Sequence, residues 1–182
     1  MWLRRIISRV ISLQANDFEL FGMPIQFAMT RDALDVRWKE LQREAHPDRF
    51  AVEGAAAQRI AMQWSVRINE AYQRLKDPVK RAAYLCELHG APVNAENNTA
   101  MPAVFLMQQM TWREALDETQ TQAELETLLS EVQRTHQQAL ADMAQAIDDL
   151  GDYSAAVGQV RALMFIDRFA SEVRHQLDVL LD

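Results

Sequence analysis

The chain has 182 residues, 49% of them hydrophobic and only five each glycine and proline, which is long enough for one good core or two small ones. No apolar run approaches the roughly 18 residues that a membrane-spanning helix needs. A single cysteine, Cys86, excludes an internal disulfide and a thiolate cluster site, and it favours a reducing compartment. The four histidines lack the spacing of metal ligands, so we expect neither a metal nor another cofactor.

The charge of the chain is divided unevenly between its halves. Residues 1–90 hold 14 Lys and Arg against 11 Asp and Glu, a net charge of +3, whereas residues 91–182 hold 5 against 15, a net charge of −10. Nucleic acid binding needs a basic surface, and the acidic second half argues against it. Two halves of different charge favour two different partners.

The first 14 residues carry three arginines and no acid, with their apolar residues on one side of a helical projection. This pattern is typical of an organelle transit peptide or of a helix that lies on a membrane surface. The alternative, which we favour, is an N-terminal extension outside any domain. Arginine and serine interrupt every apolar run, which argues against a secretory signal.

Two amphipathic helical patterns flank a short polar tip. Their apolar residues recur at helical spacing, as Leu34, Trp38, Leu41 and Ala45 in the first and Ala61, Trp64, Ile68, Ala71 and Leu75 in the second. Pro47 ends the first helix because it lacks an N–H group and excludes His46 from the α region, so we expect His46, Pro47 and Asp48 to form a turn. Burial of both stripes requires the helices to pair antiparallel, which leaves this tip exposed.

Local signals define the remaining helices of this domain, which we predict to span residues 15–90. Polar caps, a proline at a first helical position and glycines that can adopt the left-handed conformation mark where these helices begin and end. These residues are Asn16 or Asp17, Gly22, Thr30, Asp77, Pro78 and Gly90.

Residues 91–101 break the helical pattern with a proline and a polar run, and we predict a linker between domains there. Three helical stretches follow, over about 102–118, 121–150 and from near 152 onward. The second opens with the capping-box sequence that begins at Thr121. Long one-sided helices joined by short turns predict an antiparallel three-helix bundle over residues 102–182, so the fold class is all-α.

The first helix of this bundle has more apolar residues than one buried stripe needs. Phe105, Trp112 and Leu116 fit a core stripe, and a second group lies off it. This group consists of Leu106, Met107 and Met110, which lie alongside Thr111, Glu114 and Glu118. A single methionine is most simply explained as filling a gap in the core. Apolar residues that continue into carboxylates on one face instead suit recognition of a partner.

Phe165 raises the same question in the last helix. It lies about 200° from the core residue Leu163 in a helical projection, and it shares a side with Arg161 and Arg168. It is either an aromatic wedged into a groove of the bundle or part of a binding surface, and the pattern alone favours neither.

The tip His46-Pro47-Asp48 between two helices of these lengths resembles a J domain, the module that recruits and switches DnaK-type chaperones. The stretches Phe105–Met110 and Arg113–Glu118 resemble the C-terminal domain of HscB-type J proteins, which are co-chaperones of iron–sulfur cluster assembly. The resemblance runs from about Asn16 to the end of the chain. It implies a co-chaperone without an active site, whose J domain activates the ATPase of an HscA-like chaperone and whose bundle binds an IscU-like scaffold protein.

The resemblance also implies which residues bind these partners. In J domains, basic residues on the helix before the tip meet an acidic surface of the chaperone; in an anonymous helix, basic residues interleaved with glutamates would be interpreted as a solvated face. The residues implied for chaperone binding are Lys39, Arg43, His46, Pro47, Asp48 and Arg49. The residues implied for scaffold binding are Leu106, Met107, Met110, Glu114, Glu118 and Phe165. Thr111 stands where the family commonly has an acid, and Arg49 keeps the charge of the lysine that many relatives have.

Two alternatives remain open. His46 and Asp48 would form the acid–base pair of an enzyme, although an exposed tip lacks the pocket and the third group that such chemistry needs. Otherwise the bundle binds another client, or it self-associates through Met107, Met110 and Phe165. We expect a monomer that binds no nucleic acid and no membrane, in the bacterial cytoplasm rather than an organelle matrix.

Overall fold

The computed structural model describes residues 14–94, 103–119 and 121–181, and within these ranges it contains helices and no strands, which confirms the predicted all-α class. Nearly all of the predicted N-terminal extension and most of the predicted linker lie outside the described residues. The chain divides into two compact units, Met1–Arg81 and Ala82–Asp182, at a point inside helix α5 (Pro78–Leu88). The domain boundaries at residues 90 and 101 stay predictions.

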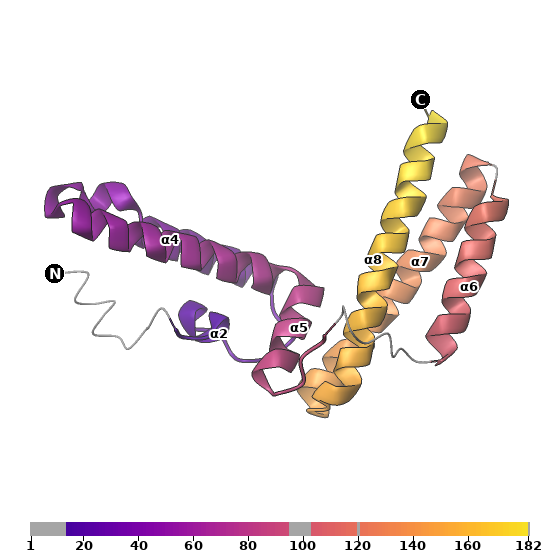
Figure 1. The fold of residues 1–182 in the computed structure, drawn as a ribbon, viewed down its shortest axis with the longest axis horizontal. Coiled ribbons are helices and arrows are strands. Elements are labelled where there is room, and N and C mark those ends of the chain that lie inside the picture. Colours follow the sequence, from indigo (N-terminus) through magenta and orange to yellow (C-terminus); the bar gives the residue numbers. More distant parts are fainter. Residues whose placement is uncertain (1–13, 95–102, 120, 182) are drawn as a thin grey trace. The chain divides into compact units, whose positions relative to one another are not determined.

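The first unit is built around an antiparallel pair of helices (Figure 1). Its elements are α2 (Asp17–Phe21), α3 (Arg31–Glu44), the 3₁₀-helix η1 (Pro47–Glu53), α4 (Ala55–Lys76) and the start of α5. The contacts between α3 and α4 run in opposite sequence order. Trp38 stacks on Tyr72 with ring centroids 4.7 Å apart, and the Gln42 amide donates to the Ser65 carbonyl at 3.1 Å.

Most of the predicted caps have the expected geometry. Asn16 forms a capping box with Glu19 at the start of α2, and Gly22 ends that helix in the left-handed conformation, with φ of 64°. The Asp77 carboxylate accepts from the N–H groups of Val79 and Lys80 at the start of α5. Thr30 occupies the N-cap position of α3, but its side chain forms no capping hydrogen bond.

The tip after α3 is longer and more regular than the predicted turn. His46 has extended backbone angles, with φ of −64° and ψ of 125°, and Pro47 begins the seven-residue helix η1. Proline favours a first helical position because its φ is preset and its missing N–H has no partner there in any case. Phe50 is buried on the inner side of η1 and anchors it to the unit.

The core of the first unit contains the predicted stripes with two exceptions. Its buried residues include Phe18, Phe21, Leu34, Leu41, Ala45, Ala61, Ile68, Ala71, Tyr72 and Leu75. Trp38 and Trp64 are only half-buried. Asp17 is fully buried and joins α2 to α4 through ion pairs with Arg67 at 2.6 Å and Arg74 at 2.9 Å.

The second unit contains the predicted antiparallel three-helix bundle, whose helices lie side by side in Figure 1. They are α6 (Ala103–Glu118), α7 (Gln122–Ala144) followed by the π-helical turn η2 (Gln145–Asp149), and α8 (Tyr153–Leu181). Thr121 forms the predicted capping box, and Gly151 has a φ of 63° in the turn before α8. The second predicted stretch therefore ends in a π turn.

The bundle core also buries one charged residue that lies on the same side of α8 as Phe165. Trp112, Val132, Met143, Leu163 and Phe169 are buried, as a three-helix core requires. Arg161, which was expected on the same side as Phe165, is also buried, and its Nε donates to the Val93 carbonyl at 3.0 Å. This hydrogen bond holds Val93 of the predicted linker against α8. Helical periodicity does not reveal such a contact.

Among the described residues, none of the helices combines the length and the apolar character that crossing a membrane requires. The same residues contain no group of three or more His, Cys, Asp or Glu side chains placed to hold a metal ion.

Candidate functional site

The tip of the first unit exposes its two ionisable side chains. The His46 side chain is 58% accessible and that of Asp48 is 88% accessible. The backbone N–H of Asp48 donates to Nδ1 of His46 at 3.3 Å, and a carboxylate oxygen of Asp48 lies 3.6 Å from the same nitrogen. The hydrogen bond caps η1 and ties the imidazole to the backbone of the exposed tip.

Arg49 joins the tip to the end of α3. Its Nη1 donates to the Arg43 carbonyl at 3.2 Å, and its backbone N–H donates to the His46 carbonyl at 3.1 Å. Ala45, just before the tip, and Phe50, two residues after it, are both buried. The predicted chaperone-binding residue Arg49 therefore also holds the tip in place.

The predicted basic surface on α3 is present as an exposed face. Lys39 and Arg43 are four residues apart and exposed, and neither forms an ion pair with any residue that the structure describes. Arg37 differs, because it pairs with Glu40 at 3.1 Å and donates to the Phe21 carbonyl at 3.2 Å. Val36, which is 57% exposed, lies on the same face at a spacing of three residues from Lys39. Helical spacing could have identified it.

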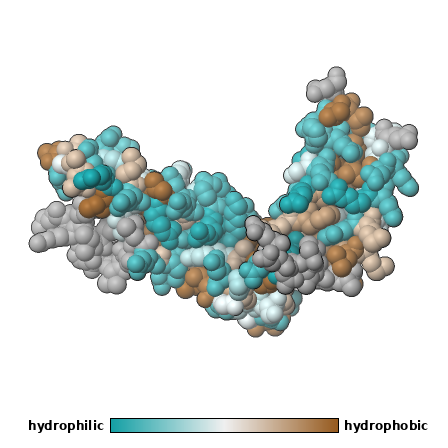
Figure 2. Space-filling model, viewed as in Figure 1, coloured by the Kyte–Doolittle hydropathy of each residue, from teal (hydrophilic) through white to brown (hydrophobic). Residues whose placement is uncertain are grey.

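The predicted scaffold-binding residues of α6 form an outward face, which we call the α6 patch. It consists of Leu106, Met107, Met110, Glu114 and Glu118, all of which are exposed. Met107 is 71% exposed and Met110 is 65% exposed, whereas Trp112 of the same helix is buried. Figure 2 shows hydrophobic surface where α6 begins. The methionines therefore do not fill gaps in the core.

Thr111 also lies on the exposed side of α6. Its hydroxyl donates to the Met107 carbonyl at 3.3 Å, one turn earlier in the helix. A threonine bonded in this way offers less to a partner than an exposed carboxylate would.

Phe165 packs into the bundle, as the first of its two interpretations expected, and its place in a binding surface stays a prediction. It is half-buried and packs against Phe169, with stacked rings 6.1 Å apart, and against the edge of Phe105 at 5.8 Å. The ring is therefore part of an aromatic cluster and yet keeps an accessible portion. Arg113 of α6, which the sequence did not single out, lies over the rings of Phe165 and Phe169.

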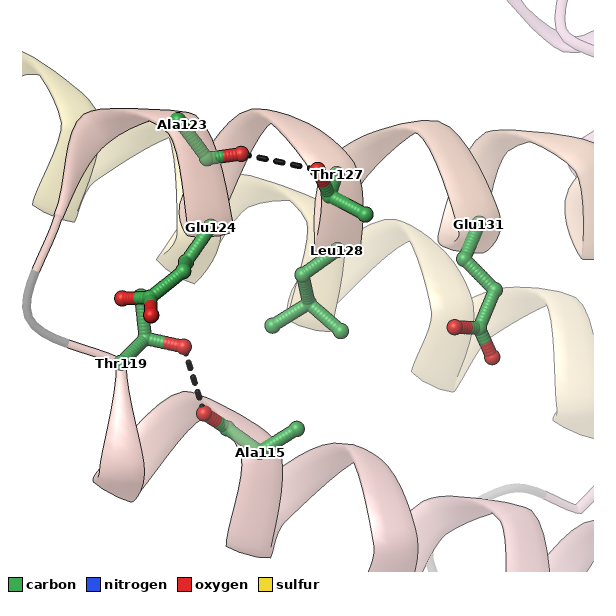
Figure 3. Close-up of a pocket in the computed structure, with 7 residues that line it drawn as sticks. All are labelled: Ala115, Thr119, Ala123, Glu124, Thr127, Leu128 and Glu131. Atoms are coloured by element: carbon green, nitrogen blue, oxygen red, sulfur yellow. Dashed lines mark hydrogen bonds between the residues drawn. The ribbon is translucent and has the colours of Figure 1, made fainter.

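A groove between α6 and α7 lies near the turn that joins them (Figure 3). It is lined by Ala115, Thr119, Ala123, Glu124, Thr127, Leu128 and Glu131. Leu128 points from α7 toward α6, and Glu131 already accepts a hydrogen bond from the Trp112 indole at 2.9 Å. The groove contains none of the predicted site residues.

Similarity to known proteins covers almost the whole chain. Residues 101–174 match the family model described as the HscB C-terminal oligomerisation domain. The co-chaperone protein HscB homolog of Burkholderia thailandensis is 45% identical over 174 residues, which are 94% of this chain and 99% of the relative. The homolog of Paraburkholderia xenovorans is 48% identical over 172 residues, which are 93% of this chain and 98% of the relative.

Solved structures give the same result for the fold. The chaperone HscB from Vibrio cholerae is 35% identical, with a TM-score of 0.78 over 91% of this chain and 99% of that one. The human co-chaperone HscB, at 23% identity, shares the fold with a TM-score of 0.80 over 93% of this chain and 83% of that one. The chain therefore belongs to the HscB family, the co-chaperones of iron–sulfur cluster assembly that combine a J domain with a C-terminal helical bundle.

Proposed function

We propose that this co-chaperone brings an IscU-like scaffold protein to an HscA-like chaperone of the DnaK type and stimulates the ATPase of that chaperone. The J domain would dock on the chaperone through the tip and the basic face of α3. The C-terminal bundle would hold the scaffold through the α6 patch and Phe165. ATP hydrolysis would close the chaperone on the scaffold and promote cluster transfer.

The observation that carries this proposal is the exposed tip. His46 and Asp48 contribute little buried surface to their own unit, and the Asp48 carboxylate is almost fully accessible. A charged group at low burial, on a backbone that a hydrogen bond ties to His46, suits recognition by a partner because the partner's cationic groups can reach it directly. Lys39 and Arg43 extend this surface along α3 with positive charge, which suits an acidic surface on the chaperone.

The composition of the α6 patch supports the second binding step. Exposed methionine and leucine side chains lie beside two carboxylates, so an apolar centre has a polar rim. Methionine adapts its shape to a partner more readily than a branched residue does. With both partners bound to one chain, the effective concentration of the scaffold at the chaperone rises without any new contact between them.

We also propose that the protein is not itself an enzyme. His46 and Asp48 lie at a convex tip where both side chains are exposed, whereas a catalytic acid–base pair usually lies in an enclosed pocket. A search for turnover of ATP by the chain without the chaperone tests this point. Hydrolysis above the buffer rate would contradict it.

Self-association of the bundle is the second candidate, because the matching family model is described as an oligomerisation domain. The exposed Met107 and Met110 would then lie between copies of this chain. Sedimentation velocity over a range of concentrations distinguishes this from the monomer that we expect. A dimer that Met107→Asp disrupts would favour self-association.

The most informative experiment is purification of the tagged full-length chain at its natural level of expression. We expect a DnaK-type ATPase and a small iron–sulfur scaffold protein to be retained together. Asp48→Asn should lose the chaperone and keep the scaffold. Retention of neither partner by the wild-type chain would contradict the proposal.

A further inference from the structure

Four aromatic rings form a contiguous cluster between α6 and α8. Trp112 stacks on Phe169 with centroids 5.5 Å apart, Phe169 stacks on Phe165, and Phe105 meets both Phe165 and Trp112 edge-on. Trp112 and Phe169 are fully buried, whereas Phe165 is only half-buried. The cluster thus runs from the core to the surface and ends in the one ring among the predicted scaffold-binding residues.

Arg113 covers the outer side of this cluster. Its guanidinium carbon lies 5.8 Å from the centroid of Phe165 and 5.4 Å from that of Phe169, within the range of cation–π attraction. Both of its terminal nitrogens also bond to the Glu172 carboxylate. Phe165, Phe169 and Glu172 follow one another along one side of α8, so a single arginine from α6 spans all three.

This arrangement requires arginine rather than another cation. A guanidinium is planar, lies flat on aromatic rings and pairs with a carboxylate through two nitrogens at once. A lysine would keep the charge but would lose the planar contact and the second hydrogen bond. Glu172 binds two nitrogens of the guanidinium, which lies against the accessible Phe165 ring.

We infer that Arg113 is a positioning residue that holds Phe165 in one half-exposed orientation ready to contact the scaffold protein. The inference rests on the proposed scaffold binding and adds to it a residue that acts through Phe165. A side chain that is already fixed loses little conformational freedom when a partner binds, and so its contact contributes more to affinity. Loss of Arg113 should therefore weaken scaffold binding although the α6 patch itself is intact.

A double-mutant cycle tests the inference. Affinity for the purified IscU-like scaffold of the same organism is measured by isothermal titration calorimetry with the full-length chain, as wild type, Arg113→Gln, Phe165→Ala and the double variant. We expect Arg113→Gln to weaken binding about two- to fivefold and Phe165→Ala to weaken it more. The double variant should match Phe165→Ala, because no ring remains to be positioned.

Two results of this cycle would overturn the inference. One is a double variant whose affinity for the scaffold lies below that of Phe165→Ala by the same factor by which Arg113→Gln alone lowers it. Arg113 would then act independently of Phe165. The other is an Arg113→Gln variant with unchanged affinity. Neither result affects the proposed function, which fails at this site only if Phe165→Ala and Leu106→Ala both leave scaffold binding unchanged.

Matched variants separate positioning from charge. Arg134→Gln removes an exposed arginine of α7 that lies outside the aromatic cluster, and it should leave the affinity for the scaffold unchanged. A loss of affinity as large as that of Arg113→Gln would overturn the inference. Arg113→Lys should lie between wild type and Arg113→Gln. In the free protein, NMR of ¹³C-labelled phenylalanine should show the Phe165 ring moving faster in Arg113→Gln, whereas the motion of the Phe169 ring should change less because that ring is buried and also stacks on Trp112.

Discussion

The backbone N–H of Asp48 donates to Nδ1 of His46 across the proline that separates them, at 3.3 Å. The proline lacks an N–H group, so this bond satisfies one of the first free amides of η1 through the side chain of the preceding residue. His46 therefore shapes the tip, and the Asp48 carboxylate, which extends beyond it, is available to a partner. We therefore expect the two residues to have separable roles.

Asp48→Asn should abolish stimulation of the chaperone ATPase and leave scaffold binding intact. The amide keeps the shape of the carboxylate but removes the charge that would pair with a cationic group on the chaperone. Steady-state ATP hydrolysis by the purified HscA-like chaperone measures the first effect, and calorimetry with the scaffold measures the second. Loss of both together would contradict the separation of roles.

Charge reversal on the basic face should weaken chaperone docking more than it changes the maximal rate. In the variant with Lys39→Glu and Arg43→Glu, we expect a higher co-chaperone concentration for half-maximal ATPase stimulation, since steering by charge mainly affects association. The wild-type value should rise with added salt, because exposed charges are screened.

The matched control for this variant is Arg59→Glu, a change at an exposed arginine of α4. It changes the net charge of the unit by as much as either of the two substitutions does, but it leaves the α3 face unchanged. An equal effect of this control would show that total charge, and not the face that carries Lys39 and Arg43, governs docking.

Local patterns were sufficient to predict the α-helices, most caps and the exposed faces, but not the 3₁₀-helix η1 or the π turn η2. The capping box at Thr121 and the left-handed Gly22 depend on neighbouring residues only, so the sequence contains their full explanation. Arg161 and Phe165 differ, because their environments come from residues far along the chain. A helical projection places such residues on a side, but it does not show what covers that side.

The same limit applies to the candidate site. The α6 patch could be predicted because spare apolar residues on one face are visible in the sequence. Arg113 could not, since its contacts with Phe165, Phe169 and Glu172 exist only when α6 and α8 pack together. The predicted roles in partner binding stay predictions until they are measured.

The variant with Leu106→Ala and Phe165→Ala should bind the scaffold about thirtyfold less tightly or weaker, because both changes remove apolar surface at the expected centre of the interface. ATPase stimulation in the absence of scaffold should be unchanged. Val179→Ala, at an exposed site near the end of α8, is the control for loss of apolar surface. Scaffold affinity that survives the double change, with the protein still folded, would contradict the proposed surface.

Asp17→Asn should destabilise the first unit by about 2–3 kcal/mol. The change leaves Arg67 and Arg74 without their buried counter-charge, and the figure is moderate because Arg74 is partly exposed and can be hydrated. Urea unfolding followed by circular dichroism measures the effect. A loss of stability below about 0.5 kcal/mol would show that neutral hydrogen bonds can replace the two ion pairs of Asp17.

Cys86 provides a test of the second unit that depends on pH. Burial raises the pKa of its thiol to about 11, because the thiolate would be formed away from water. The unfolded chain releases the proton near pH 9.0, so the free energy of unfolding should fall as the pH rises from about 9 to about 11. Below that range this group should contribute no pH dependence.

Alkylation by iodoacetamide measures the same environment directly. At pH 8 the native protein should react at least about a hundredfold more slowly than the protein in urea, since reaction needs both the thiolate and access to it. The native rate should continue to rise up to about pH 11, whereas the rate in urea should level off about one pH unit above 9.0, where its thiol is almost fully ionised. A native rate with the same dependence on pH as the rate in urea would mean that Cys86 reacts as an ordinary exposed thiol and that the end of α5 does not pack as described.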